Sequence, residues 1–123
     1  MAKVLVADDE EDIRTFTTRT LTHEGHDVTL AEDGAQAIEL MKQNDYDLII
    51  LDIMMPNKNG IEVVQHMKKT ERLQNVPIFL FSASGPINNL TDDVKEMVDD
   101  YLRKPFMSKE FLDIVNRLIN KSG

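Results

Sequence analysis

Polar side chains that can do chemistry stand at four points of this 123-residue chain, each directly after a short apolar run. They are the pair Asp8 and Asp9, then Asp52, Ser82 and Lys104. Side chains at the same end of neighbouring parallel strands converge, and carboxylates that close repel one another unless a cation lies between them. A carboxylate nucleophile, a metal and a phosphate-holding lysine together make a phosphoryl-transfer site. The spacing therefore predicts such a site, provided that the runs are strands of one sheet.

Five apolar runs alternate with helical patterns along the chain. The predicted strands are Lys3–Ala7, Asp27–Ala31, Leu48–Leu51, Pro77–Phe81 and Tyr101–Arg103. Alternation of this kind predicts an α/β fold, a doubly wound (βα)5 parallel sheet with right-handed crossovers and helices on both faces. Leu48–Leu51 is the most apolar run, so we expect it at the centre, with the second and fifth strands at the edges. The strand order 2-1-3-4-5 follows, in one domain over residues 1–123.

Turn and capping residues mark where the helices begin and end. Gly25 is expected to end the first helix, and Asp33, Asn59 and Ser108 are expected to cap the second, third and fifth. The fourth helix is predicted from an apolar stripe that starts at Leu90.

Composition narrows the function classes. The net charge of −8 and the pI of about 4.8 argue against direct nucleic-acid binding and against attachment to anionic membranes. No cysteine is present, which excludes disulfides and thiolate-bound metals. The first residues show no signal-peptide pattern, and no apolar run has the length of a membrane span, so we expect a cytoplasmic protein.

The complete set of motifs resembles the receiver domain of two-component response regulators, over essentially the whole chain. Asp8-Asp9 is similar to the acidic pair of that family, and Asp52 lies in a Leu-Asp-Ile-Met-Met-Pro segment similar to its phospho-acceptor loop. Ser82 matches the hydroxyl position, and Lys104 opens a Lys-Pro-Phe signature. The steps of 43, 30 and 22 residues between Asp9, Asp52, Ser82 and Lys104 are typical of the family.

The resemblance implies a flavodoxin-like receiver fold and a phosphoryl group accepted on Asp52. The donor would be a phosphohistidine on a histidine kinase or a histidine phosphotransfer protein. The cofactor would be Mg²⁺ (or Mn²⁺), held by Asp9, Asp52 and the backbone carbonyl of Met54, with Asp8 acting through a water. Oxygen-only ligation suits such a hard cation.

The resemblance also implies roles for the remaining motif residues. Lys104 and Ser82 would bind phosphoryl oxygens, and the Lys104–Pro105 peptide bond would be cis. Ser82 and Tyr101 would form a switch that changes the face made by the fourth helix, fifth strand and fifth helix, where a downstream protein binds. On the first helix, Arg14, Thr15 and Thr18 would contact the histidine-bearing partner.

Several functions stay open at this point. The expected one is a stand-alone response regulator that catalyses only its own phosphorylation and dephosphorylation and is otherwise no enzyme. The alternatives are a receiver fragment of a longer transcriptional regulator and a pseudo-receiver that binds partners without phosphate. An aspartyl phosphohydrolase would want a second aspartate two residues after its nucleophile, where this chain has Met54. A flavodoxin would need a phosphate-binding loop after the first strand, where this chain has an acidic run that begins at Asp8 and would repel phosphate.

Overall fold

The structure is a computed structural model that describes residues 2–82 and 92–122. The strands are β1 (Lys3–Ala7), β2 (Asp27–Ala31), β3 (Leu48–Asp52), β4 (Ile78–Ser82) and β5 (Asp100–Arg103). The helices are α1 (Glu11–His23), α2 (Gly34–Gln43), α3 (Gly60–Lys68), α4 (Asp92–Met97) and α5 (Ser108–Ser122), with a short 3-10 turn at Glu71–Leu73. The five predicted strand–helix units are therefore present in the predicted order.

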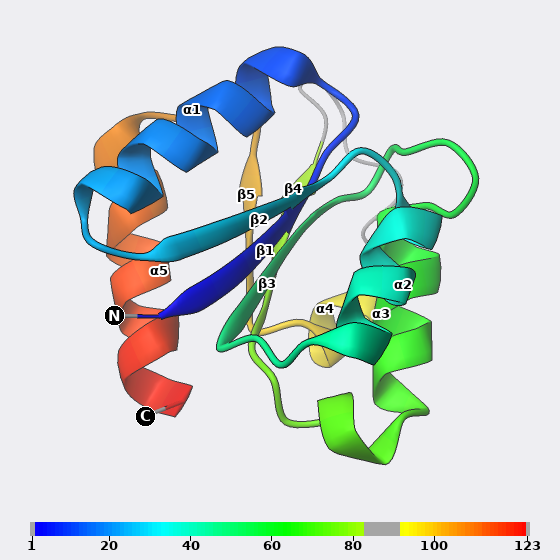
Figure 1. Cartoon of the computed structure of the whole chain (residues 1–123). Coiled ribbons are helices and arrows are strands. Elements are labelled where there is room, and N and C mark those ends of the chain that lie inside the picture. Colours follow the sequence, from blue (N-terminus) through cyan, green and yellow to red (C-terminus); the bar gives the residue numbers. More distant parts are fainter. Residues whose placement is uncertain (1, 83–91, 123) are drawn as a thin grey trace.

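All five strands pair in parallel, in the order β2-β1-β3-β4-β5. Every residue of β3 and β4 is buried, whereas β2 has one buried residue, Ala31, and β5 has none. Helices cover both faces of a sheet of this kind, so its inner strands need apolar side chains on both sides. The predictions of a central third strand and of two edge strands are confirmed (Figure 1).

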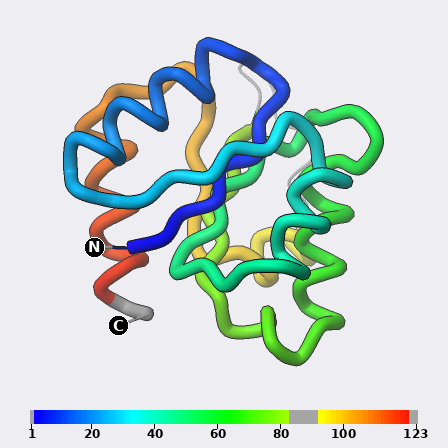
Figure 2. The backbone as a smooth tube through the Cα atoms, viewed as in Figure 1, coloured from blue at the N-terminus to red at the C-terminus, as the bar shows by residue number. Residues whose placement is uncertain are grey.

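Two layers of apolar side chains flank the sheet. One lies between the sheet and α2, α3 and α4, and it contains Ile49, Leu51 and Val64. The other lies between the sheet and the pair α1 and α5, and it contains Val6, Ile50 and Leu118. The backbone tube shows the same arrangement, with α1 and α5 on one side of the strands and α2 and α3 on the other (Figure 2).

An aromatic cluster fills the second layer beneath α1 and α5. It contains all five phenylalanines of the chain, which are Phe16, Phe79, Phe81, Phe106 and Phe111. The paired ring centroids lie 4.9 to 6.0 Å apart, within the range at which aromatic rings attract one another. The residues that precede Ser82 and those that follow Lys104 therefore pack in the same core layer as α1 and α5.

Most predicted helix ends are confirmed. Gly25 follows α1 with a φ of 87°, Asp33 accepts a hydrogen bond from the Gln36 backbone, and Asn59 forms a reciprocal capping box with Glu62. The expectation for Ser108 was wrong by one position. Ser108 is the first residue of α5, and the preceding Met107 accepts the first helical hydrogen bond, from Phe111, while its own N–H donates to Glu110. Leu90 lies outside the described residues.

The predicted strands also differ slightly from the observed ones. β3 ends at Asp52 and β4 runs from Ile78 to Ser82, so both site residues belong to their strands rather than following them. The cause is continued pairing, because Asp52 lies opposite Phe81, and the N–H of Lys104 donates to the Ser82 carbonyl. Pairing of the last residue fixes the backbone from which each of the two side chains projects.

Candidate functional site

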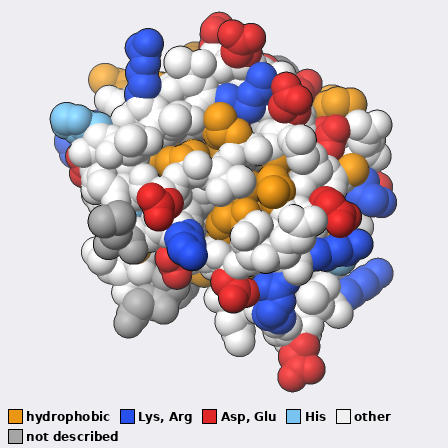
Figure 3. All heavy atoms as spheres, in the orientation of Figure 1, with side chains coloured by type: hydrophobic (Ala, Val, Ile, Leu, Met, Phe, Trp, Pro, Cys, Tyr) orange, Lys and Arg blue, Asp and Glu red, His pale blue; other side chains and the backbone are white. Residues whose placement is uncertain are grey.

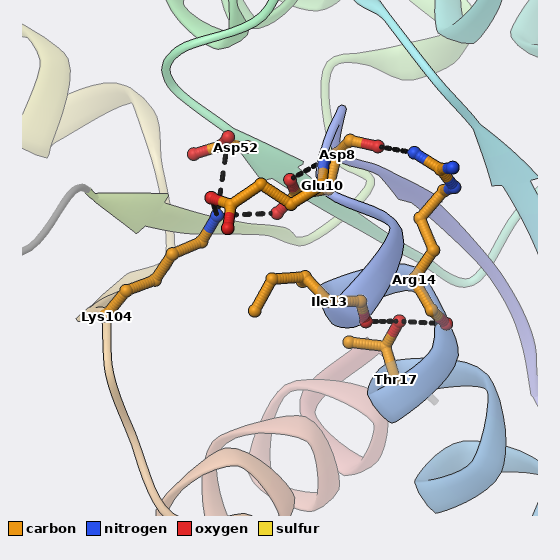
Figure 4. Close-up of polar contacts among 7 residues, drawn as sticks. All are labelled: Asp8, Glu10, Ile13, Arg14, Thr17, Asp52 and Lys104. Atoms are coloured by element: carbon orange, nitrogen blue, oxygen red, sulfur yellow. Dashed lines mark hydrogen bonds and ion pairs between the residues drawn. The ribbon is translucent and has the colours of Figure 1, made fainter.

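Four of the predicted site residues meet at the carboxyl edge of the sheet. Asp8 follows β1, Asp52 ends β3, Ser82 ends β4, and Lys104 follows β5. Asp8, Asp52, Ser82 and Lys104 are all buried, which is unusual for three charged groups and a hydroxyl. Figure 4 shows the Lys104 side chain reaching from the end of β5 toward the carboxylates of Asp8, Glu10 and Asp52.

The ammonium of Lys104 holds the site together. Its Nζ lies 2.8 Å from Asp8 Oδ2, 2.8 Å from Glu10 Oε1 and 3.4 Å from Asp52 Oδ2. The Lys104 Nζ also lies 5.9 Å from the centroid of the Phe81 ring, at the top of the aromatic cluster. The Lys104–Pro105 peptide bond that follows is cis, as the resemblance implied.

Internal hydrogen bonds fix the β1–α1 loop that carries Asp8. The Glu10 backbone N–H donates to Asp8 Oδ1 at 2.9 Å, and Arg14 Nη1 donates to the Asp8 carbonyl at 2.9 Å. Arg14 also pairs with Glu32, at 3.5 Å, across the neighbouring loop. Arg14 is therefore engaged within the domain, with 16% of its side chain exposed.

The loop after Asp52 is fixed in a similar way. Ile53 donates its N–H to the Phe81 carbonyl, and Gly60 donates to the Ile53 carbonyl at 2.9 Å. A Cβ at Gly60 would lie 2.3 Å from the Asp52 carbonyl oxygen, so only glycine permits this close approach. Met54, whose carbonyl was predicted as a metal ligand, lies on this loop with 58% of its surface exposed.

The start of α2 braces the same loop from outside. The Asn57 side chain donates to Asp33 Oδ2 at 2.7 Å, and Gly34 donates its N–H to the Lys58 carbonyl at 3.0 Å. Asn57 has a φ of 68°, in the left-handed region that asparagine tolerates better than most residues. The pKa of Asp33 is lowered by hydrogen bonds from the Gln36 backbone and the Asn57 side chain.

Burial and charge shift the pKa values of the buried groups. Burial raises the pKa of Asp52 from 3.8 to about 7, and repulsion from Asp8 adds to this against the opposing effect of Lys104. Burial also raises the pKa of Asp8, although its hydrogen bond with Lys104 acts in the other direction. Burial alone would lower the pKa of Lys104, but its hydrogen bonds with Asp8 and Glu10 outweigh burial and raise it.

The acidic side chains fit a divalent cation. Asp8, Asp9, Glu10 and Asp52 each offer one carboxylate oxygen, and these oxygens all lie within 4.8 Å of one another. Opposite ligands of an octahedral magnesium ion are about 4 Å apart, so small side-chain adjustments suffice. An all-oxygen donor set favours a hard cation such as Mg²⁺.

The remaining predicted residues lie around this centre. The Ser82 hydroxyl is buried, and it has no hydrogen-bond partner among the described residues. Tyr101 is 39% exposed on β5, with Lys95 Nζ 5.7 Å from its ring centroid. Thr15 and Thr18 line a shallow hollow on α1 together with Arg14 and Leu30. Figure 3 shows acidic side chains gathered at the rim above the start of α1. The functional roles of all these residues stay predictions.

Comparison with known proteins gives the family. The family model of the response regulator receiver domain matches residues 4–116. The chain belongs to the response regulator receiver family. A solved receiver domain, that of the Francisella response regulator 1452, superposes on this one with a TM-score of 0.89 at 36% identity, covering 100% of both chains. The chemotaxis response regulator CheY4 of Vibrio cholerae gives 0.87 at 29% identity, covering 96% of this chain and 98% of CheY4.

Curated relatives of this receiver domain include longer regulators. The transcriptional regulatory protein CusR of Escherichia coli is 37% identical over 98% of this chain, which covers 52% of CusR. The uncharacterized transcriptional regulatory protein YrkP of Bacillus subtilis is 40% identical over 88% of this chain and 45% of YrkP. The chain thus spans about half the length of these relatives. Within residues 2–82 and 92–122, no helix of the receiver domain combines the length and hydropathy that crossing a membrane requires.

Two contacts of the site were not predicted from the sequence. Glu10 was interpreted only as part of an acidic run, yet it binds Lys104 as closely as Asp8 does. The Arg14 guanidinium binds the Asp8 carbonyl and Glu32, and the contact of Arg14 with a partner stays a prediction. Glu10 is the N-cap residue of α1 and Arg14 lies in the helix, and the spacing of neither residue in the sequence indicates these contacts.

Proposed function

We propose that this receiver domain accepts a phosphoryl group on Asp52 from a phosphohistidine of a histidine kinase or phosphotransfer protein. The observation that carries the proposal is the buried Asp52 carboxylate 3.4 Å from the Lys104 ammonium, beside acidic oxygens that fit a cation. A nucleophile, a positive point charge and a cation site are the parts that phosphoryl transfer needs.

In the proposed reaction, an Asp52 carboxylate oxygen attacks phosphorus and forms an acyl phosphate. The bond from phosphorus to the donor nitrogen breaks, and the histidine keeps that electron pair. Lys104 and the buried Ser82 hydroxyl would bind phosphoryl oxygens, and Asp9, Asp52 and the Met54 carbonyl would hold the ion. When bound there, Mg²⁺ would neutralise the charge that builds up on the transferring group. The domain acts as a catalyst only on itself, in gaining the phosphoryl group and in losing it to water.

The Ser82 hydroxyl supports a ligand-dependent role. Among residues 2–82 and 92–122 this buried hydroxyl has no hydrogen-bond partner. A buried hydroxyl without a partner costs roughly 1–3 kcal/mol, and a phosphoryl oxygen would supply an acceptor. We propose that this gain, together with movement of Tyr101, shifts the face formed by α4, β5 and α5 toward the form that binds a downstream protein.

Intact mass spectrometry tests the phosphorylation. The protein is incubated with Mg²⁺ and acetyl phosphate, and we expect the mass gain of one phosphoryl group. The gain should disappear in Asp52→Asn and on removing Mg²⁺ with EDTA. A wild type that gains no phosphoryl mass, or a mass gain in Asp52→Asn equal to that of the wild type, would refute the assignment of Asp52. Partner binding that is identical in wild type and Asp52→Asn would instead favour the pseudo-receiver.

The curated relatives bear on the regulator as a whole. CusR and YrkP are about twice as long as this chain, which favours a receiver within a longer regulator, whereas CheY4 has the length of a stand-alone one. An immunoblot of source cells with an antibody to this domain separates the two. A band near 14.1 kDa identifies the stand-alone regulator, and a band of about double that mass identifies the longer one.

A further inference from the structure

The Lys104 ammonium has three N–H donors, and three carboxylates surround it. The partners are Asp8 and Glu10, both at 2.8 Å, and Asp52 at 3.4 Å. Two donors are therefore hydrogen-bonded to carboxylates, and a third carboxylate lies within ion-pair distance, before any phosphoryl group arrives. Under the proposed function, a phosphoryl oxygen needs one of these donors, so one carboxylate has to withdraw.

The three partners differ in how easily they can leave. The Asp8 side chain is 0% exposed and also accepts a hydrogen bond from the Glu10 backbone, so its withdrawal would leave a buried charge unpaired. Asp52 is the acceptor itself and is 4% exposed. Glu10 is 58% exposed and can exchange Lys104 for water at small cost, as exposed ion pairs generally can.

We infer that the Glu10 carboxylate occupies, in the resting protein, the place on Lys104 that a phosphoryl oxygen takes on phosphorylation. Glu10 is thus a positioning residue, which holds the ammonium beside Asp8 and Asp52 and is displaced when the phosphoryl group binds. This inference rests on the proposed function. The Glu10 and Lys104 side chains lie side by side in Figure 4, where the Glu10 carboxylate covers the ammonium.

The exchange predicts a measurable competition. Removing Glu10 should free one Lys104 donor and tighten the binding of a phosphoryl mimic by about 2- to 5-fold, the range expected for an exposed ion pair. The loss of one negative charge also attracts an anion without any competition. Glu11 provides the matched control, since it is the exposed neighbour and Glu11→Ala changes the net charge equally.

The probe is beryllofluoride with Mg²⁺, and binding is followed by fluorine NMR. We expect Glu10→Ala to bind it more tightly than Glu11→Ala, and Glu10→Gln to lie between Glu10→Ala and the wild type, because glutamine keeps an acceptor without the charge. Equal affinities in Glu10→Ala and Glu11→Ala overturn the inference. Weaker binding in Glu10→Ala also overturns it, because Glu10 would then be helping to hold the cation.

A second measurement needs neither metal nor mimic. Proton–nitrogen NMR of the lysine side chains in EDTA reports how fast the Lys104 ammonium exchanges its hydrogens with water. We expect faster exchange in Glu10→Ala and no change in Glu11→Ala, with urea unfolding to verify that both variants fold. An unchanged Lys104 signal in Glu10→Ala contradicts the inference. A wild type that binds no beryllofluoride and gains no phosphoryl mass contradicts the proposed function instead.

Discussion

Replacing Asp52 with asparagine should stabilise the metal-free protein, although it removes the proposed acceptor. Burial and the neighbouring Asp8 raise the pKa of Asp52 to about 7, so its ionised form is unfavourable in the folded state. The folded protein therefore binds the Asp52 proton more tightly than the unfolded chain does. It follows that the wild type loses stability as the pH rises from about 4 to about 7, and that the loss is complete above this range.

The size of this effect follows from the two pKa values. The step from 3.8 to about 7 corresponds to roughly 4 kcal/mol at 1.36 kcal/mol per pKa unit. The gain will be smaller than this limit, because the asparagine amide is itself polar and its burial also costs free energy. We expect Asp52→Asn to exceed the wild type by about 2–4 kcal/mol at pH 8. At pH 5 the difference should be less than half of its value at pH 8, because only the part of the loss between about pH 4 and pH 5 has then taken place.

Urea unfolding in EDTA at pH 5, 6, 7 and 8 measures the difference directly. Asp113→Asn serves as the control, because Asp113 is 67% exposed and pairs only weakly with Lys109 at 3.2 Å, so its effect should stay within about 1 kcal/mol. A stability difference between Asp52→Asn and wild type that is the same at pH 5 and pH 8 would refute the reasoning. So would a variant that is less stable than the wild type at pH 8.

Three further predictions concern the metal, the loop and the helix cap. Mg²⁺ at 100 times its Kd should raise the free energy of unfolding of the wild type by about 2.7 kcal/mol, as measured by urea titrations with and without Mg²⁺. The same Mg²⁺ concentration should raise the free energy of unfolding of Asp9→Asn much less. Gly60→Ala should cost about 1–3 kcal/mol or more because its Cβ would meet the Asp52 carbonyl at 2.3 Å, and a melting temperature equal to that of the wild type speaks against this contact. Asp33→Ala should lower the free energy of unfolding by about 1 kcal/mol at pH 7, measured by urea unfolding. The difference from the wild type should decrease below about pH 4, where Asp33 becomes protonated in spite of its lowered pKa. A difference that does not change with pH would mean that the cap does not depend on the charge.

Strand order and the meeting of the site residues could be predicted because they depend on regularities that cover many residues. β3 and β4 are apolar along their whole length, and the buried centre of a parallel sheet demands this. Asp52 and Ser82 then had to lie at the same edge of the sheet, since parallel strands all end there. The caps at Asp33 and Asn59 were equally accessible, because each depends on one side chain and its own next turn.

Contacts between separate loops could not be predicted in this way. The bond from Asn57 to Asp33 joins residues 24 positions apart, and the pair of Lys104 with Glu10 spans 94 positions. Both depend on side-chain rotamers and on loop paths that no periodic pattern encodes. Arg14 shows the same limit, because a polar residue on a helix can turn outward to a partner or inward to a carbonyl, and its spacing in the sequence is the same in both cases.

The cluster of five phenylalanine rings also determines when, during synthesis of the protein, the site can be completed. Phe111 on α5 packs against Phe16, Phe79 and Phe81, so the aromatic cluster beneath Lys104 is incomplete until α5 has been synthesised. A chain still attached to the ribosome carries Asp52 long before it carries that floor, and synthesis proceeds from the N-terminus. The phosphoryl acceptance proposed for Asp52 therefore requires that α5 has been synthesised and has packed on the rings.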